Sequence, residues 1–193
     1  MSRESLRIDR DGTSLAGVQF SGGGEPALCP VVLVHGLAGY AGEWRQTAAA
    51  IGGDRRVFAP DQRGHGRSER RPSDVSPQAF TADLSAWFSA LRLEPAVVVG
   101  QSMGGLTALL FAADRPELVR GLVLVEATPD GDPEGAADVA QKVGGWLRSW
   151  PVPFPTRTAA VEFFGGRRTG PGPGQTGWSA GPTGSGRRST RTC

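Results

Sequence analysis

One serine in this sequence has neighbours whose spacing could make its hydroxyl a nucleophile. Ser102 lies in the stretch Gly100-Gln101-Ser102-Met103-Gly104, with a glycine two residues away on either side. Glycines at these positions let a strand and a helix approach closely and allow a strained serine conformation, which lifts the hydroxyl clear of the sheet. The N–H of Met103 then lies at the start of the helix, where it can stabilise a developing oxyanion. The stretch therefore predicts attack by Ser102 on a carbonyl carbon.

The residues around this motif predict the two elements that must position it. Residues 97–99 are three valines, a β-branched run that is typical of a buried strand. From Leu106 onward, apolar residues recur with helical spacing, and we expect the helix to end near Arg115-Pro116. A strand, a sharp turn and a helix thus follow one another, which is the setting that the serine motif requires.

Two further polar loops follow apolar runs. Residues 30–34 lead into His-Gly-Leu-Ala-Gly at residues 35–39, and residues 61–68 read Asp-Gln-Arg-Gly-His-Gly-Arg-Ser. Together with the serine motif, these loops make the chain resemble the α/β-hydrolase superfamily, in its serine hydrolase branch, over roughly residues 6–164. The resemblance implies an α/β fold with a mostly parallel sheet and flanking helices. It also implies that the backbone N–H of Leu37 is the second donor of the oxyanion hole, beside that of Met103.

The resemblance further implies a triad in the order serine, acid, histidine, and the chain departs from that order. Its two histidines, His35 and His65, both precede Ser102, and residues 165–193 contain no Asp or Glu. Glu126 is the possible acid, because it ends a predicted strand after which some relatives carry one. We expect His35 to tie down its loop by hydrogen bonds. The alternative is that His35 or His65 swings onto Ser102.

The remaining patterns predict the rest of the core. Asp61 and Arg63 resemble groups that hold the scaffold by hydrogen bonds and do not react. Predicted elements are a hairpin around Asp11-Gly12, strands at 31–34, 57–59 and 122–125, and a helix between Ser76-Pro77 and Pro95.

Changes in composition divide the chain into three parts. We expect a hydrolase-like core in residues 1–129, the start of a helical cap in residues 130–164, and a low-complexity tail rich in Gly, Arg and Thr in residues 165–193. Of the 29 tail residues, 25 are Gly, Pro, Arg, Ser or Thr, so we expect the tail to be disordered. We also expect the last strands of the family's sheet to be missing. The chain would then be truncated or frameshifted after about residue 164, the other hypothesis being a genuine flexible tail.

The predicted cap is rich in aromatic residues. Apolar residues follow a helical spacing from Val139 to Trp150. Five aromatic residues fall in this part of the chain: Trp146, Trp150, Phe154, Phe163 and Phe164. They either form an apolar lid over the pocket or pack the cap onto the core.

Composition limits the classes of function. The chain has 193 residues, of which 38% are hydrophobic and 21% charged, as in a globular protein. No apolar run approaches the ~20 residues of a membrane helix, and the N-terminus lacks an apolar signal core, so we expect a cytoplasmic protein without a membrane partner. Five arginines lie in the tail, away from the predicted fold, which argues against a nucleic-acid partner. Cys29 and Cys193 show no metal-ligand spacing, and we expect neither a metal nor a cofactor.

Two functions fit these observations. The first is hydrolysis of a small-molecule ester, lactone or related carbonyl substrate by Ser102. Acyl transfer, perhydrolysis and C–C bond hydrolysis use the same residues and stay open. The second is a catalytically dead, truncated remnant or a non-enzymatic binding module, because loss of the histidine from a serine triad costs about 10⁶-fold in turnover.

Overall fold

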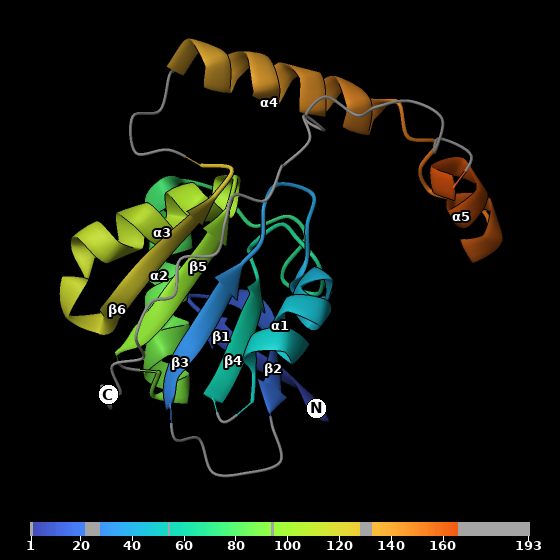
Figure 1. Ribbon diagram of the computed structural model, residues 1–193. Coiled ribbons are helices and arrows are strands. Elements are labelled where there is room, and N and C mark those ends of the chain that lie inside the picture. Colours follow the sequence, from blue (N-terminus) through green and yellow to red (C-terminus); the bar gives the residue numbers. More distant parts are fainter. Residues whose placement is uncertain (1, 22–27, 54, 94, 128–132, 166–193) are drawn as a thin grey trace, which may run out of the picture. The chain divides into compact units, whose positions relative to one another are not determined.

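The computed structural model describes residues 2–21, 28–53, 55–93, 95–127 and 133–165 (Figure 1). The chain divides near residue 131 into two compact units, each of which is described by itself. The first unit contains six strands: β1 (Ser2–Arg10), β2 (Thr13–Ser21), β3 (Leu28–Val34), β4 (Arg55–Asp61), β5 (Ala96–Gln101) and β6 (Val119–Val125). Its helices are η1 (Ala41–Trp44), α1 (Arg45–Ile51), α2 (Pro77–Leu91), α3 (Met103–Asp114) and η2 (Pro116–Leu118).

The strands form one mostly parallel sheet in the order β1-β2-β4-β3-β5-β6. The first two strands are the predicted hairpin, and β2 continues it antiparallel to β4. The β3 strand is parallel to both β4 and β5, and β5 is parallel to β6. The carboxyl ends of these parallel strands therefore meet at one edge of the sheet, where the predicted loops lie. This architecture confirms the predicted fold class.

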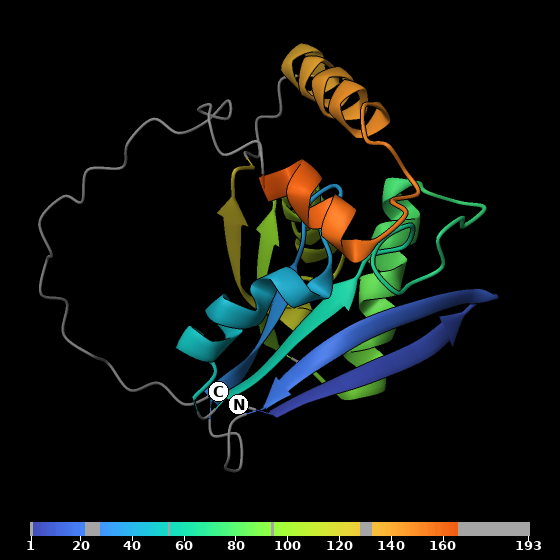
Figure 2. The same ribbon diagram turned by 90° about the vertical axis from the view of Figure 1, so that its right-hand side faces the viewer.

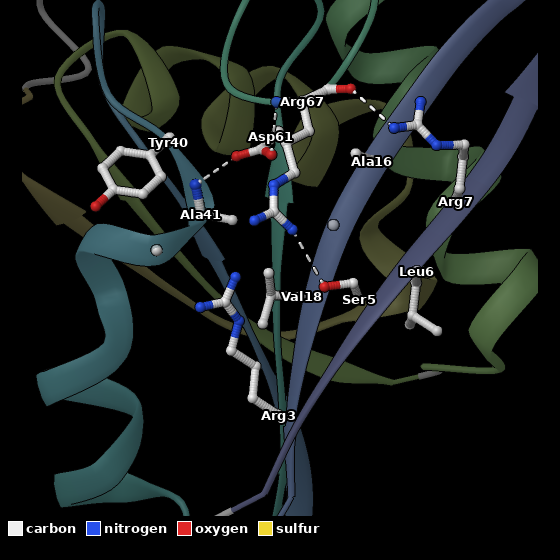
Figure 3. Close-up of a pocket in the computed structure, with 12 residues that line it drawn as sticks. Arg3, Ser5, Leu6, Arg7, Ala16, Val18, Tyr40, Ala41, Asp61 and Arg67 are labelled. Atoms are coloured by element: carbon white, nitrogen blue, oxygen red, sulfur yellow. Dashed lines mark hydrogen bonds between the residues drawn. The ribbon is translucent and has the colours of Figure 1, made fainter. Parts of the chain in front are cut away.

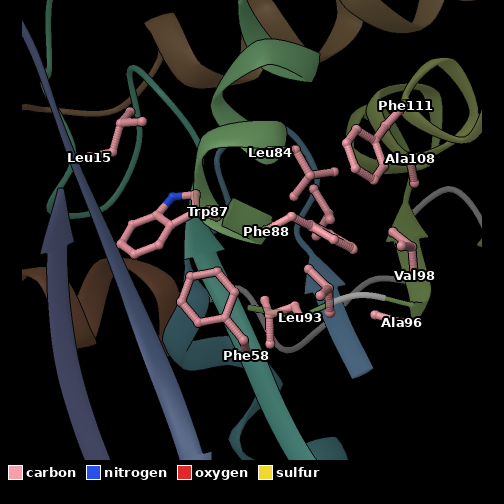
Figure 4. Close-up of a cluster of buried hydrophobic side chains, with 12 residues drawn as sticks. Leu15, Phe58, Leu84, Trp87, Phe88, Leu93, Ala96, Val98, Ala108 and Phe111 are labelled. Carbon is pink, nitrogen blue, oxygen red and sulfur yellow. The ribbon is translucent and has the colours of Figure 1, made fainter. Parts of the chain in front are cut away.

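Helices cover both faces of the sheet, and the strand sequences reflect this. Val32 and Val34 pack in a cluster with side chains of α2 and α3, whereas Val31 and Leu33 pack in a second cluster with η1 and α1. Figures 1 and 2 show α2 and α3 on one side of the sheet and α1 on the other. Strands buried on both faces have a continuous apolar sequence, which is why these runs were recognisable. Figure 4 shows the larger cluster, in which Trp87 of α2 lies against Phe58 of β4.

The helix boundaries follow local signals where such signals exist. Ser76 caps α2 by accepting a hydrogen bond from the Ala79 N–H, Pro77 is the first helical residue, and Arg92 ends the helix in the left-handed region at φ 51°. The sequence did not predict α1, because its alanine-rich stretch buries only Ala48 and shows no apolar periodicity. The two edge strands of the described sheet are β1 and β6.

The second unit contains α4 (Pro133–Arg148) and α5 (Arg157–Gly165). The sequence predicted the first of these helices and not the second. Aromatic side chains pack on one another within the unit: Trp150 meets both Trp146 and Phe164 edge-on, with ring centroids 4.7 and 4.8 Å apart. Mutual packing therefore accounts for part of this aromatic content, and the lid over the pocket stays a prediction. Among the described residues, no helix combines the length and apolar character needed to cross a membrane.

Candidate active site

Ser102 occupies a strained corner between β5 and α3. Its backbone lies at φ 52° and ψ −118°, a conformation that L-residues rarely adopt. The corner is held on both sides, because the Ser102 N–H donates to the Val125 carbonyl at 2.9 Å and the Ser102 carbonyl accepts from the Gly105 N–H at 2.8 Å. The surrounding backbone thus keeps the serine in this conformation.

The glycines around Ser102 are required by close backbone approaches. A Cβ on Gly100 would lie 2.3 Å from the Gly104 carbonyl oxygen, so any side chain there would separate β5 from α3. A Cβ on Gly104 would lie 2.4 Å from the carbonyl oxygens of Val34 and His35. The first turn of α3 therefore packs directly against the end of β3, which brings the loop after β3 to the serine corner.

The two backbone N–H groups predicted to form the oxyanion hole lie on these neighbouring segments. Leu37 is in the loop after β3, where the Gly39 N–H donates to the Gly36 carbonyl at 3.1 Å, and Met103 is the first residue of α3. Within the described part of the chain, neither the Leu37 N–H nor the Met103 N–H has a hydrogen-bond partner. Both donors are therefore free to bind a ligand, and their role in an oxyanion hole stays a prediction.

His35 holds the scaffold, as predicted from the sequence. Its side chain is fully buried, Nδ1 donates to the Gly36 carbonyl at 2.8 Å and Nε2 accepts from the Gln62 N–H at 2.9 Å. Burial lowers the pKa of His35 to about 4, so the ring is neutral near pH 7. Both ring nitrogens are engaged, which leaves neither to accept a proton from Ser102. The His65 ring lies beside it, at a centroid distance of 5.2 Å.

Gln62 connects the three segments that meet at the site, a role that no spacing or motif in the sequence predicts. Its Nε2 donates to the His35 carbonyl at 2.6 Å, and its Oε1 accepts from the Thr107 hydroxyl at 3.0 Å. The side chain thereby joins the end of β4, the loop after β3 and α3. A buried amide with all of these partners satisfied fixes the loop positions more firmly than packing alone.

The predicted scaffold residues of the loop after β4 make the expected hydrogen bonds. The Asp61 carboxylate accepts from the Ala41 N–H at 2.6 Å and the Arg67 N–H at 3.0 Å. Arg63 is 3% exposed and forms a two-point ion pair with Asp83 of α2, at 2.7 and 2.6 Å. This pair raises the pKa of Arg63. Neither Asp61 nor Arg63 is left free to react.

Glu126 follows β6 at the residue after the one that binds the Ser102 N–H. It has a positive φ of 53°, it is exposed, and its Oε2 accepts from Gln101 Nε2 at 2.8 Å. Gln101 immediately precedes Ser102, so this hydrogen bond ties the acid to the serine corner. Sheet register brings the carboxylate near the nucleophile, because Gln101 pairs with Val125, and the catalytic role of Glu126 stays a prediction.

The Ser102 hydroxyl has no hydrogen-bond partner among the described residues. No group of three or more metal-binding side chains occurs there either. The site as described therefore combines an unpaired hydroxyl, two unpaired N–H groups and a nearby carboxylate, without a base bonded to the serine.

Comparison with known proteins identifies the family. A family model described as alpha/beta hydrolase fold matches residues 30–162. The mouse sn-1-specific diacylglycerol lipase ABHD11 is 40% identical over 115 residues, covering 58% of this chain and 37% of that protein. The rat 1-acylglycerol-3-phosphate O-acyltransferase ABHD5 is 33% identical over 153 residues, covering 76% of this chain and 42% of that protein. This chain thus spans about two fifths of the length of these relatives.

Solved structures show the same likeness. An α/β hydrolase from Novosphingobium aromaticivorans superposes with a TM-score of 0.65 at 30% identity, covering 74% of this chain and 50% of that chain. The thioesterase domain from the curacin biosynthetic pathway superposes with a TM-score of 0.65 at 25% identity, covering 85% of this chain and 61% of that chain.

Proposed function

Because this chain belongs to the α/β-hydrolase family, we propose that it carries the nucleophile and oxyanion half of a serine hydrolase site for acyl substrates. The observation that supports this most directly is the strained Ser102 corner beside two N–H groups that have no partner among the described residues, those of Leu37 and Met103. A hydroxyl raised on such a corner, with donors already in place, suits attack on a carbonyl group.

The proposed reaction is acyl transfer through Ser102. The Oγ attacks the carbonyl carbon, its proton passes to a base that the described residues do not supply, such as imidazole from solution, and the N–H groups of Leu37 and Met103 hold the negative oxygen of the tetrahedral intermediate. The intermediate collapses to an acyl-serine as the alcohol or thiol leaves with a proton, and water then hydrolyses the acyl-serine. Glu126, fixed by Gln101, would orient the protonated base.

The substrate class follows from the chemistry and agrees with the relatives. A diacylglycerol lipase, an acylglycerol-phosphate acyltransferase and a thioesterase domain all act, by their names, on acyl carbonyl groups. We therefore propose an ester, thioester or lactone as the substrate.

A second candidate function is binding of acyl compounds without turnover. Both histidines precede Ser102 in the sequence, and His35 uses both of its ring nitrogens in hydrogen bonds. A serine site without a base loses about 10⁶-fold in turnover but keeps its oxyanion-hole donors, which suits binding of an acyl compound without appreciable hydrolysis.

Chemical rescue tests the proposal. Hydrolysis of p-nitrophenyl acetate by the whole chain is measured while imidazole is added as an external base, with Ser102→Ala reporting the reaction of imidazole alone. We expect slow turnover that rises with imidazole above the Ser102→Ala background, and an unchanged rise in Ser89→Ala, which removes an exposed hydroxyl from α2. Equal rates in the wild-type and Ser102→Ala proteins at every imidazole concentration would contradict the hydrolase proposal and favour binding without turnover.

A further inference from the structure

A second concave site lies on the first unit, away from the serine corner. It is a cavity of about 160 Å³ between β1, β2 and η1, with the loop after β4 at one end (Figure 3). Two strands, β4 and β3, separate β2 from β5 in the sheet, so this cavity is distinct from the Ser102 site. A single water needs about 10–15 Å³ of such space, so the cavity has room for a polyatomic ligand.

Three arginines line this cavity: Arg3, Arg7 and Arg67. Figure 3 shows the side chains of Arg3 and Arg67 extending into the same space from opposite ends. Arg67 Nη1 donates to the Ser5 hydroxyl at 3.3 Å, and the Arg3 side chain forms no hydrogen bond with any described residue. Arg7 supports the backbone of Arg67, because its Nη2 donates to the Arg67 carbonyl at 3.2 Å.

Acidic side chains do not neutralise these charges. Within the parts of the chain that the structure describes, none of the three arginines forms an ion pair. Asp61 is the acidic residue in the cavity wall, and both of its carboxylate oxygens accept backbone N–H groups, from Ala41 and Arg67. Its charge is therefore directed into the scaffold, while the exposed guanidinium groups of Arg3 and Arg67 face a common space without an acidic side chain between them.

We propose that this cavity binds a phosphate group, as the free ion or as a phosphate monoester. Like charges that face one space are stabilised by an anion between them, and guanidinium groups bind phosphate oxygens with strong, charge-assisted hydrogen bonds. A phosphate monoester carries about −1.5 to −2 charges at pH 7, which matches the two guanidinium charges that lack an ion-pair partner among the described residues. A carboxylate offers one charge and two oxygens, and so matches the pair less well.

Calorimetric titration of the whole chain with inorganic phosphate tests this site. We expect saturable binding that weakens as salt is added, and a loss of about tenfold or more in affinity in Arg3→Met and in Arg67→Met, each of which keeps a long apolar side chain. Arg120→Met is the matched control, because Arg120 is an exposed arginine on β6, at the far edge of the sheet, and its affinity should equal that of the wild type.

Further ligands distinguish the sources of the phosphate group. Phenyl phosphate represents a soluble monoester, and phosphatidylcholine vesicles with and without phosphatidic acid represent a lipid headgroup. Binding of either phosphate ligand that is lost in Arg3→Met supports the site and names its source. Absence of saturable phosphate binding to the wild-type chain, or equal losses in Arg120→Met and Arg3→Met, would overturn the proposal. Neither result depends on whether Ser102 is reactive.

Discussion

The strain at Ser102 predicts that replacing this serine with glycine makes the protein more stable. A residue with a Cβ at φ 52° and ψ −118° costs about 1–3 kcal/mol, and glycine adopts this conformation freely. Glycine also adds conformational entropy to the unfolded chain, which lowers stability by about 0.5–1 kcal/mol. Relative to Ser102→Ala, which keeps the Cβ and lacks the hydroxyl, we expect Ser102→Gly to be more stable by about 1 kcal/mol.

Urea denaturation of the two variants measures this difference. In thermal unfolding, the same gain of about 1 kcal/mol corresponds to a rise in Tm of about 2–4 °C for a domain of this size. The matched comparison is Ser89→Gly against Ser89→Ala in α2, where helical geometry makes glycine less stable by about 1 kcal/mol. The sign of the glycine effect should therefore be opposite at the two serines. If Ser102→Gly is no more stable than Ser102→Ala, the corner does not store strain and the geometric argument for a raised nucleophile fails.

Three further predictions concern the scaffold around the site. Gly104→Ala should destabilise the fold by about 1–3 kcal/mol in urea denaturation, because its Cβ would lie 2.4 Å from the His35 carbonyl oxygen. In the control Gly121→Ala the nearest atom to the Cβ lies at 3.9 Å, so this variant should cost far less, and equal losses would contradict the close approach at Gly104. Arg63→Met should cost about 2–3 kcal/mol, because the buried Asp83 carboxylate loses two charge-assisted hydrogen bonds and keeps Arg10 as its ion-pair partner. Lys142→Met, which breaks an ion pair whose lysine side chain is 73% exposed, should cost less than about 1 kcal/mol, and an equally small loss in Arg63→Met would show that the buried pair is dispensable. The free energy of unfolding should fall by about 3 kcal/mol as the pH falls from about 6.5 to about 4, because the unfolded state binds a proton at His35 that the folded state excludes. A pH series of denaturation curves measures this fall, and the same slope in His35→Gln as in the wild type would refute the assignment to His35.

The sequence predicted the parts of the molecule that depend on neighbouring residues. The hairpin around Gly12, the cap of α2 at Ser76 and the corner at Ser102 are each specified within a few residues by glycine, proline or serine. Their structures agree with the predictions because local backbone preference and burial act in the same direction. The short helix α1 and the helix α5 lack such signals and were not predicted.

The contacts that join distant segments could not be predicted from spacing. Gln62 binds the backbone of His35 and the side chain of Thr107, and these contacts depend on strand order and register. The same holds for the cavity that brings Arg3 and Arg67 together, because β1 must pair with β2 and β2 with β4 before the two arginines share a space. Strand pairing of this kind is set by the whole fold.

Labelling with a fluorophosphonate probe, followed by mass spectrometry of the digested protein, tests the central claim most directly. We expect the phosphonyl adduct on Ser102, formed faster when imidazole is present and absent from Ser102→Ala. An adduct on another hydroxyl group, such as that of Tyr40, or labelling that is the same in Ser102→Ala, would contradict the claim that the serine at this corner is the nucleophile.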